Sequence, residues 1–159
     1  MSFAVATIEA GNGRLGICPA PGRFGDYASD LRQILAWAPS LVLTMTEAAE
    51  LARLGAESFA DDLKTAGVDW VHLPIRDFGA PGASVQALWP STSARVRAML
   101  TDKGRVLAHC YGGCGRSGMA LLRVMVEMGE EGPVALERLR QVRPCAVETE
   151  AQRRWAMRL

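Results

Sequence analysis

The chain has 159 residues, of which 49% are hydrophobic and 22% are charged, and its formal net charge is +1. This length suits one hydrophobic core, so we expect a single domain over residues 1–159 with a core over about 13–158. The composition excludes a disordered tail, and the near-neutral charge gives no reason to expect binding to nucleic acid or to a membrane surface.

The N-terminal segment and the cysteines indicate the compartment. The opening apolar stretch is interrupted by Thr7 and Glu9 and has no basic residues before it, which excludes a typical secretory signal. No run approaches the roughly 18 apolar residues of a membrane helix. The four cysteines do not form paired metal-binding knuckles, a pattern typical of a reducing compartment. We therefore expect a cytoplasmic protein; a monomer is compatible with the sequence.

Strand and helix patterns alternate along the chain. In chain order we expect a strand over 14–18, a helix over 26–38, a strand over 40–45, helices over 47–54 and 58–66, a strand over 68–74, a loop over 75–84, a helix over 85–100, a strand over 104–110, a buried helix from 119, and two further helices, one with Pro133 in its first turn and one opened by Thr149. This order predicts an α/β fold with a mostly parallel central sheet and helices on both faces. Ligands of such sheets bind beyond the carboxyl ends of the strands.

The segment HCYGGCGRSG, residues 109–118, lies at such a strand end and opens the buried helix. Its glycines allow backbone N–H groups to converge into a concavity for an anion, and the helix N-terminus adds positive charge. A thiol in this position is favoured as thiolate, so Cys110 is the candidate nucleophile. The phosphate-binding residues that we expect are Tyr111, Gly112, Gly113, Cys114, Gly115 and Arg116.

Three side chains near Cys110 complete the expected chemistry. Arg116, which closes a CX5R motif, can hold two phosphate oxygens with its planar guanidinium. Ser117 can donate a hydrogen bond to the sulfur, and His109 can orient the cysteine from behind. An attack on phosphorus also needs an acid to protonate the leaving oxygen.

Asp77 is the candidate acid because it lies on the Gly- and Pro-flanked loop IRDFGAPG. Asp69 falls within a predicted strand and Asp102 lies just before one. Arg76 and Phe78, beside the acid, and Tyr111 are expected at the rim of the site.

These residues resemble a known family. HCYGGCGRSG resembles the HCxxGxxRS signature of cysteine-dependent protein tyrosine and dual-specificity phosphatases, and LPIRDFGAP resembles their general-acid loop. LGICPAPG, HCYGG and RPCAVET are similar to the kinase-associated, cyclin-dependent kinase inhibitor 3 type, and the likeness runs from about Gly13 to Trp155. It implies a protein tyrosine phosphatase-like fold and a phosphorylated protein as substrate.

The resemblance also implies a two-step reaction, without metal or cofactor, in which Cys110 takes the phosphoryl group and Asp77 protonates the leaving oxygen and then assists water. Selectivity between phosphotyrosine, phosphoserine, phosphothreonine and lipid phosphates stays open. Cys114 departs from the family pattern, because relatives more often have an apolar residue there. It could form a reversible disulfide with Cys110, although a free buried cysteine is the commoner state.

Several residues have simpler interpretations. Cys18 and Cys145 are expected to be packing residues, His72 a polar-face residue of a strand, and Gln152 part of a capping box.

Two other functions compete with a phosphatase. A rhodanese-like sulfurtransferase also uses a loop cysteine before a helix, but it does not normally carry the Arg-Ser ending or need an acid. A non-catalytic phosphoprotein-binding module would usually lack Cys110, Arg116 or Asp77. A nucleotide-binding loop is excluded because no Lys precedes Ser117.

Overall fold

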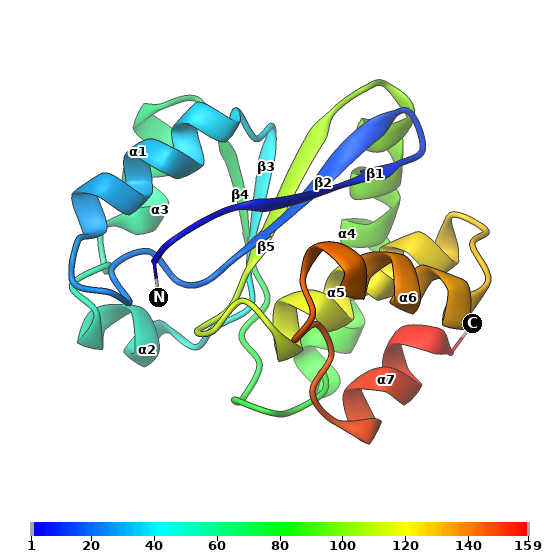
Figure 1. Cartoon of the computed structure of the whole chain (residues 1–159). Coiled ribbons are helices and arrows are strands. Elements are labelled where there is room, and N and C mark those ends of the chain that lie inside the picture. Colours follow the sequence, from blue (N-terminus) through cyan, green and yellow to red (C-terminus); the bar gives the residue numbers. More distant parts are fainter. Residues whose placement is uncertain (1, 159) are drawn as a thin grey trace.

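The computed structural model describes residues 2–158, which form a five-stranded sheet with helices on both faces (Figure 1). The elements in chain order are β1 Ala6–Ala10, β2 Gly13–Cys18, α1 Tyr27–Trp37, β3 Leu41–Thr44, α2 Ala48–Arg53, α3 Phe59–Thr65, β4 Asp69–His72, α4 Ala83–Thr101, β5 Arg105–His109, α5 Gly115–Glu127, α6 Gly132–Val142 and α7 Glu150–Met157.

The strand order is β1-β2-β5-β3-β4, and all neighbours are parallel except β1 and β2. The predicted α/β fold with a mostly parallel sheet is therefore confirmed. The strand β1 was not predicted. It pairs with β2 through the two-residue turn Gly11–Asn12, where Gly11 has a φ of +57°. A Gly-Asn pair between strands is a hairpin signal, so this strand could have been read from the sequence.

Alternate residues of the central strands face two separate cores. Val106 and Ala108 of β5 lie in the core covered by α4, α5, α6 and α7. Leu107, between them, packs with Ile34 of α1 and Phe59 of α3 on the other face. Two-sided burial explains why β3 and β5 are apolar nearly throughout.

The helices follow local signals in the sequence. The Asp26 side chain accepts a hydrogen bond from Ser29 N and caps α1, as predicted. The predicted capping box of Thr149 and Gln152 is present at the start of α7. Helix α5 is buried on nearly every side, because it lies between the sheet and α6 and α7.

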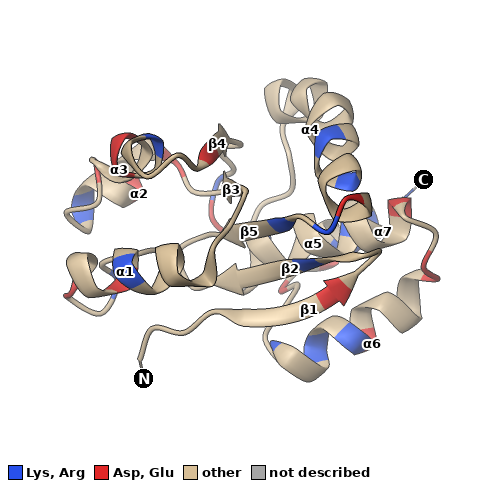
Figure 2. Cartoon of the chain, turned by 90° about the horizontal axis from the view of Figure 1, so that it is seen from above, with Lys and Arg blue, Asp and Glu red and all other residues tan. Residues whose placement is uncertain are grey.

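Charge is spread over the molecule. Figure 2 shows acidic and basic residues interspersed over the helices and strand ends, in agreement with the near-neutral sequence. None of the helices within residues 2–158 is long and apolar enough to cross a membrane.

Candidate active site

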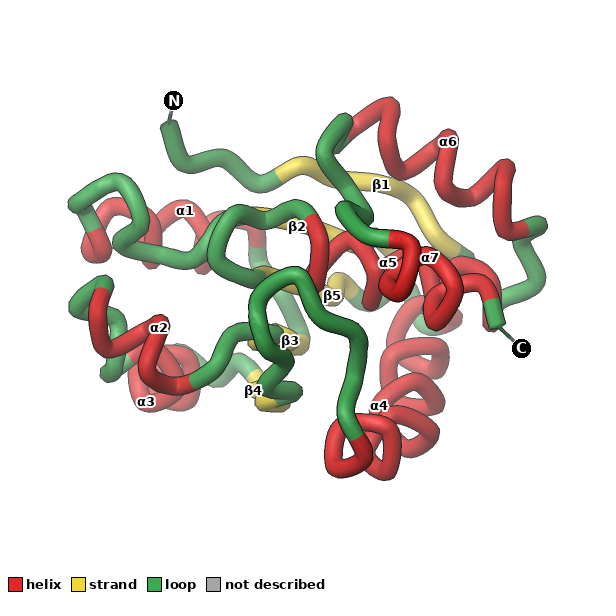
Figure 3. The backbone as a smooth tube through the Cα atoms, turned by 90° about the horizontal axis from the view of Figure 1, so that it is seen from below, coloured by secondary structure: helices red, strands yellow, loops and turns green. Residues whose placement is uncertain are grey.

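The loops that follow β2, β3, β4 and β5 lie together at the carboxyl ends of the parallel strands, and the connection between α6 and α7 joins them (Figure 3). We call residues 110–116 the cysteine loop, residues 75–82 the acid loop and residues 143–149 the C-terminal loop. The sheet thus gathers into one place segments that are far apart in the sequence, as the fold class predicts.

Cys110 follows β5 directly and is 3% exposed. It is a free thiol, and its Sγ lies 3.2 Å from the Ser117 hydroxyl oxygen. Ser117 is completely buried in the first turn of α5. The sulfur therefore has one fixed hydrogen-bond partner at the N-terminus of a buried helix, where negative charge is favoured.

Neighbouring segments hold the carbonyl groups of the cysteine loop. The Tyr111 carbonyl accepts a hydrogen bond from Ala20 N at 3.0 Å, and the Cys114 carbonyl accepts one from Val147 N at 3.1 Å. The Gly112 and Gly113 carbonyls accept hydrogen bonds from Arg143 Nη2 and Nε, at 2.9 and 2.8 Å. These hydrogen bonds occupy the carbonyl groups of the loop and fix its peptides, so its backbone N–H groups stay available to an anion.

Gly113 is the glycine of this loop whose backbone needs the left-handed region, with a φ of +71°. A Cβ on Gly113 would lie 2.5 Å from the Cys18 carbonyl carbon. A Cβ on Gly115 would instead lie 2.3 Å from Oε1 of Glu148. Gly113 therefore serves both chain geometry and packing, whereas Gly115 makes room for side chains of the C-terminal loop.

Arg116 is 1% exposed and is held by Glu50 of α2, which the sequence analysis missed. Arg116 Nη1 and Nη2 donate to the two Glu50 carboxylate oxygens at 2.8 and 2.9 Å, and Nη1 also donates to the Ile75 carbonyl at 2.8 Å. Burial alone would raise the pKa of Glu50, but hydrogen bonds from Arg116 and from Glu47 N hold it below its ordinary value. The pair is therefore ionised, and it fixes the plane of the guanidinium.

Two nitrogens of Arg116, Nε and the Nη2 that also donates to Glu50, have a side that faces away from Glu50. Its Nε is buried and has no hydrogen-bond partner among residues 2–158. Its Nη2 forms an ion pair with Asp77 at 3.1 Å. An unpartnered buried donor is unfavourable in a folded protein unless it serves a ligand. The Nε and Nη2 groups together form a two-pronged edge of the kind that can bind an oxyanion.

Asp77 lies in the acid loop with a half-exposed side chain. Its Oδ1 accepts a hydrogen bond from Phe78 N at 3.0 Å, and Phe78 takes a φ of +62°. Asp69 and Asp102 lie at the amino ends of β4 and β5, on the opposite edge of the sheet. The structure thus brings Asp77, and neither alternative, to the edge that carries Cys110.

His109 is fully buried, and burial lowers its pKa to about 4. Its Nδ1 lies 3.1 Å from the Cys110 carbonyl oxygen, which can only accept, so Nδ1 carries the proton. In the neutral ring Nε2 then accepts from the Thr44 hydroxyl at 2.8 Å, and Thr44 accepts from Trp70 Nε1 at 2.7 Å. This chain of hydrogen bonds fixes the backbone at Cys110. His72 instead contacts the Thr46 carbonyl and stacks on Trp70.

The cysteine assignments need correction. Cys114 is bonded to Cys145, with a Cα–Cα distance of 5.1 Å, and Cys110 is free. The suggested Cys110–Cys114 bond is therefore absent, and the prediction that Cys145 is a packing residue was wrong. Sequence separation hid the pair, because Cys145 approaches the cysteine loop only when α6 has folded back along α5. Cys18 is buried and free, as predicted.

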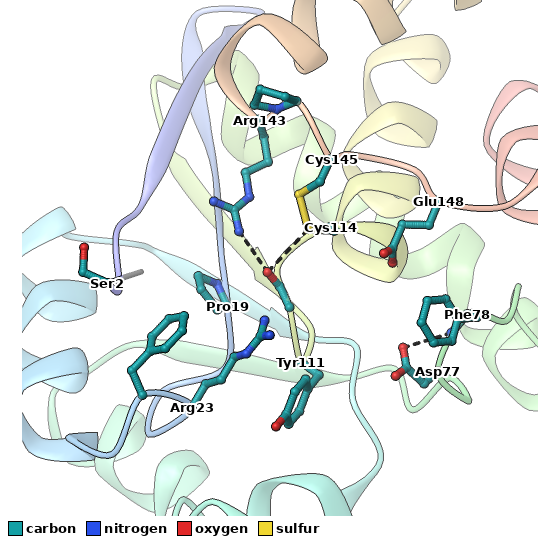
Figure 4. Close-up of a pocket in the computed structure, with 13 residues that line it drawn as sticks. Ser2, Pro19, Arg23, Asp77, Phe78, Tyr111, Cys114, Arg143, Cys145 and Glu148 are labelled. Carbon is teal, nitrogen blue, oxygen red and sulfur yellow. Dashed lines mark hydrogen bonds between the residues drawn. A yellow bond between two sulfur atoms is a disulfide. The ribbon is translucent and has the colours of Figure 1, made fainter.

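A cavity of about 830 Å³ adjoins the cysteine loop and is lined by its residues Tyr111, Gly112 and Cys114, whereas the buried Cys110 and Arg116 lie behind this lining (Figure 4). Tyr111 and Phe78 line it, as expected, but Arg76 does not. Figure 4 shows Asp77, Phe78 and Glu148 on one side of the cavity, and Arg23 with Tyr111 on the other. Among residues 2–158 no group of three His, Cys, Asp or Glu side chains is arranged to hold a metal ion.

Gln152 makes contacts beyond the capping box at the start of α7. It is fully buried, its Nε2 donates to the Gly79 carbonyl at 3.1 Å, and its Oε1 accepts from Glu148 N at 2.9 Å. This third residue of α7 therefore links the acid loop to the C-terminal loop. The sequence showed the capping spacing but not this second contact.

Comparison with known proteins identifies the family of the chain. Residues 28–130 match the model of the family described as polymorphic toxin system, DSP-PTPase phosphatase. The chain belongs to this family. Membership confirms the predicted relation to dual-specificity phosphatases.

Relatives of this DSP-PTPase protein extend the match over most of its length. Cyclin-dependent kinase inhibitor 3 of Mus musculus is 27% identical over 135 residues, which cover 81% of this chain and 63% of that protein. The chain thus spans less than two thirds of this relative.

Two solved structures are similar as well. Tk-PTP in its active form is 30% identical, with a TM-score of 0.71, and the match covers 90% of this chain and 88% of that one. Kinase associated phosphatase, with its catalytic-site cysteine replaced by serine, has a TM-score of 0.84 at 19% identity, covering 98% of this chain and 93% of that one. The second likeness shows a shared fold.

Proposed function

We propose that this DSP-PTPase chain hydrolyses phosphate monoesters of proteins through a phosphocysteine intermediate on Cys110. The observation that carries the proposal is the buried, unpartnered Nε of Arg116 beside an ion-paired Nη2, on a loop whose first residue is a free thiol. A phosphate that occupies this edge gives Arg116 the partner that it lacks. The same phosphate comes under the N-terminus of α5, next to the sulfur.

In the first step the Cys110 thiolate attacks phosphorus, an S–P bond forms and the P–O bond to the leaving group breaks. A bound phosphate dianion takes Arg116 Nη2 as its partner in place of Asp77, which frees the Asp77 carboxyl from its ion pair. Asp77 then gives its proton to the leaving oxygen. The exposed acid loop gives this carboxyl the room to move from Arg116 to the leaving group.

In the second step water attacks the phosphocysteine, Asp77 takes a proton from this water, and the S–P bond breaks. Inorganic phosphate leaves, and Cys110 returns as the thiolate. The Ser117 hydroxyl, 3.2 Å from Sγ, stabilises the sulfur as it departs. Both steps use the same two reacting side chains, so both need the acid loop to stay over the cysteine loop.

The cavity indicates the substrate class. Its volume of about 830 Å³ exceeds that of a phosphate ion and is in the range of sites for larger ligands. Tyr111 and Phe78 provide aromatic surface at its mouth, which suits the ring of a phosphotyrosine side chain. We infer that phosphotyrosine in a protein is the primary substrate, with phosphoserine and phosphothreonine as further candidates. We also infer that residues 1–159 act as one catalytic domain.

The test is turnover of para-nitrophenyl phosphate in EDTA by wild type, Cys110→Ser and Asp77→Asn. We expect no turnover by Cys110→Ser and a loss on the order of 100-fold or more for Asp77→Asn, the usual contribution of a general acid. Asp102→Asn is the matched control, because this aspartate lies at the far edge of the sheet, and it should keep wild-type activity.

The controls also separate the alternatives. If wild type binds phosphate but does not turn over the ester, the protein is a phosphoprotein-binding module and not an enzyme. If wild type turns over thiosulfate with cyanide but not the phosphate ester, the protein is a sulfurtransferase.

A further inference from the structure

The Cys114–Cys145 disulfide joins the cysteine loop to the C-terminal loop at the wall of the cavity (Figure 4). Cys114 is the fifth residue of the cysteine loop and the N-cap of α5. Cys145 is exposed, and Cys114 is half-buried. A covalent bond therefore ends inside the expected phosphate cradle, four residues from Cys110.

The bond belongs to a set of contacts between the same two loops. Arg143 donates to the Gly112 and Gly113 carbonyls, and Val147 N donates to the Cys114 carbonyl. Each of these contacts fixes one peptide group of the cysteine loop against the C-terminal loop. The disulfide is the covalent member of this set, and unlike the others it can be opened by chemistry.

We propose that Cys114 and Cys145 are positioning residues for phosphate binding and that their disulfide is a thiol-controlled switch on the cysteine loop. This inference rests on the proposed function of the site. With the bond closed, the loop is held in the form that binds phosphate. With the bond open, the loop samples other forms and binds phosphate less tightly.

The switching reaction is a thiol–disulfide exchange with a dithiol as the reductant. One thiolate of the dithiol attacks Sγ of Cys145, the more exposed sulfur, and a mixed disulfide forms as Cys114 leaves. The second thiol then displaces Cys145, so that the dithiol becomes a disulfide and both cysteines become thiols. Cys114 is suited as the leaving sulfur, because the N-terminus of α5 stabilises its thiolate. A small disulfide such as oxidised glutathione runs the exchange in reverse.

Two effects weaken phosphate binding in the open state. The loop loses its covalent anchor, although Arg143 and Val147 still hold it. The freed Cys114 also places a thiol, or a thiolate favoured by the helix N-terminus, where the cradle otherwise presents donors to an anion. If the binding form is populated for about a tenth to a third of the time, the dissociation constant rises about three- to tenfold.

The test measures binding of inorganic phosphate to Cys110→Ser by titration calorimetry, before and after treatment with dithiothreitol. This background cannot turn over, so the reductant acts on no nucleophile. We expect the dissociation constant to be three- to tenfold higher after reduction. Oxidised glutathione should restore the original value. Equal constants in both states would overturn the switch. An oxidised Cys110→Ser protein that binds no phosphate would instead contradict the proposed function, so the two failures are distinguishable.

Variants separate the bond from other effects of the reductant. The double variant Cys114→Ser/Cys145→Ser, with Cys110 intact, should show a raised KM for para-nitrophenyl phosphate, a kcat close to that of wild type, and no response to dithiothreitol. Cys18 is the one cysteine that is neither the nucleophile nor part of the disulfide. The variant Cys18→Ala should therefore still respond to dithiothreitol. A double variant with wild-type KM, or labelling that finds free thiols at both positions in protein purified without reductant, would overturn the proposal.

Discussion

Replacement of Glu50 by glutamine tests how Arg116 is held. The carboxylate offers one oxygen to each terminal nitrogen of Arg116, and one of these oxygens also accepts from Glu47 N. An amide keeps one acceptor, turns its NH₂ group toward a donor, and removes the charge that balances a guanidinium of 1% exposure. Loss of a charge-assisted hydrogen bond costs about 1.5–3 kcal/mol, and an uncompensated buried charge brings the total to about 3–5 kcal/mol.

We therefore expect Glu50→Gln to lose about 3 kcal/mol of unfolding free energy, somewhat less than full removal of the partner. Guanidinium chloride unfolding measures this loss, and kcat/KM on para-nitrophenyl phosphate measures the site. Because displacement of a binding group by about 1 Å can reduce rates about 100-fold, activity should fall on that order under conditions where the variant is still folded.

Asp69→Asn is the matched control. Like Glu50→Gln, it replaces the acidic partner of an arginine by its amide. The Asp69 and Arg95 side chains, however, are 57% and 44% exposed. Exposed pairs contribute about 0–1 kcal/mol, so stability should hardly change and activity should stay. If Glu50→Gln matched Asp69→Asn in both assays, the inference that Glu50 positions Arg116 would be refuted.

Three further predictions concern the same site. Burial lowers the His109 pKa from 6.5 to about 4, so the unfolded state takes up a proton before the folded state as pH falls. The stability present above pH 6.5 should therefore decrease by up to about 3 kcal/mol between pH 6.5 and 4. Melting followed against pH measures this loss, which should be smaller in His109→Gln. Gly113→Ala should abolish phosphate binding in calorimetry, since its Cβ would lie 2.5 Å from the Cys18 carbonyl carbon at a positive φ; unchanged binding would contradict the cradle geometry. Gln152→Ala should free the acid loop and lower kcat on the order of tenfold, unless the link to the Gly79 carbonyl is unimportant, in which case only stability changes.

Features set by local signals were open to prediction from the sequence. The caps at Asp26 and Thr149 are encoded by spacing of a few residues, so helix starts were placed correctly. Cys110, Arg116 and Ser117 lie within eight residues at a strand end, so one motif is enough to group them. The strand β1 was missed although the Gly11–Asn12 turn signals it, because an alternating pattern of five residues at a sheet edge is weak.

Contacts that exist only after folding were not open to the same reasoning. Glu50 looks like an ordinary helix residue in the sequence, and only the folded chain brings it to its partner Arg116, 66 positions away. Thr44 likewise contacts His109 without lying in any motif, and the resemblance of RPCAVET did not reveal that its Arg143 binds the cysteine loop. The Cys114–Cys145 bond depends on how α6 returns along α5, and sequence spacing cannot supply that path.

The layout of the sheet limits how far this protein can be shortened. The segment that the family shares, residues 28–130, contains Glu50, Asp77, Cys110 and Arg116, yet it lacks both β2 and the C-terminal loop. Without β2, β5 becomes an edge strand and loses one of its two neighbours just where it delivers the nucleophile. Residues near the two ends of the chain thus pack against the segment that matches the family model and support its site from both sides. A minimal catalytic fragment has to retain both ends, and shortening from either side should remove activity before it removes the motif.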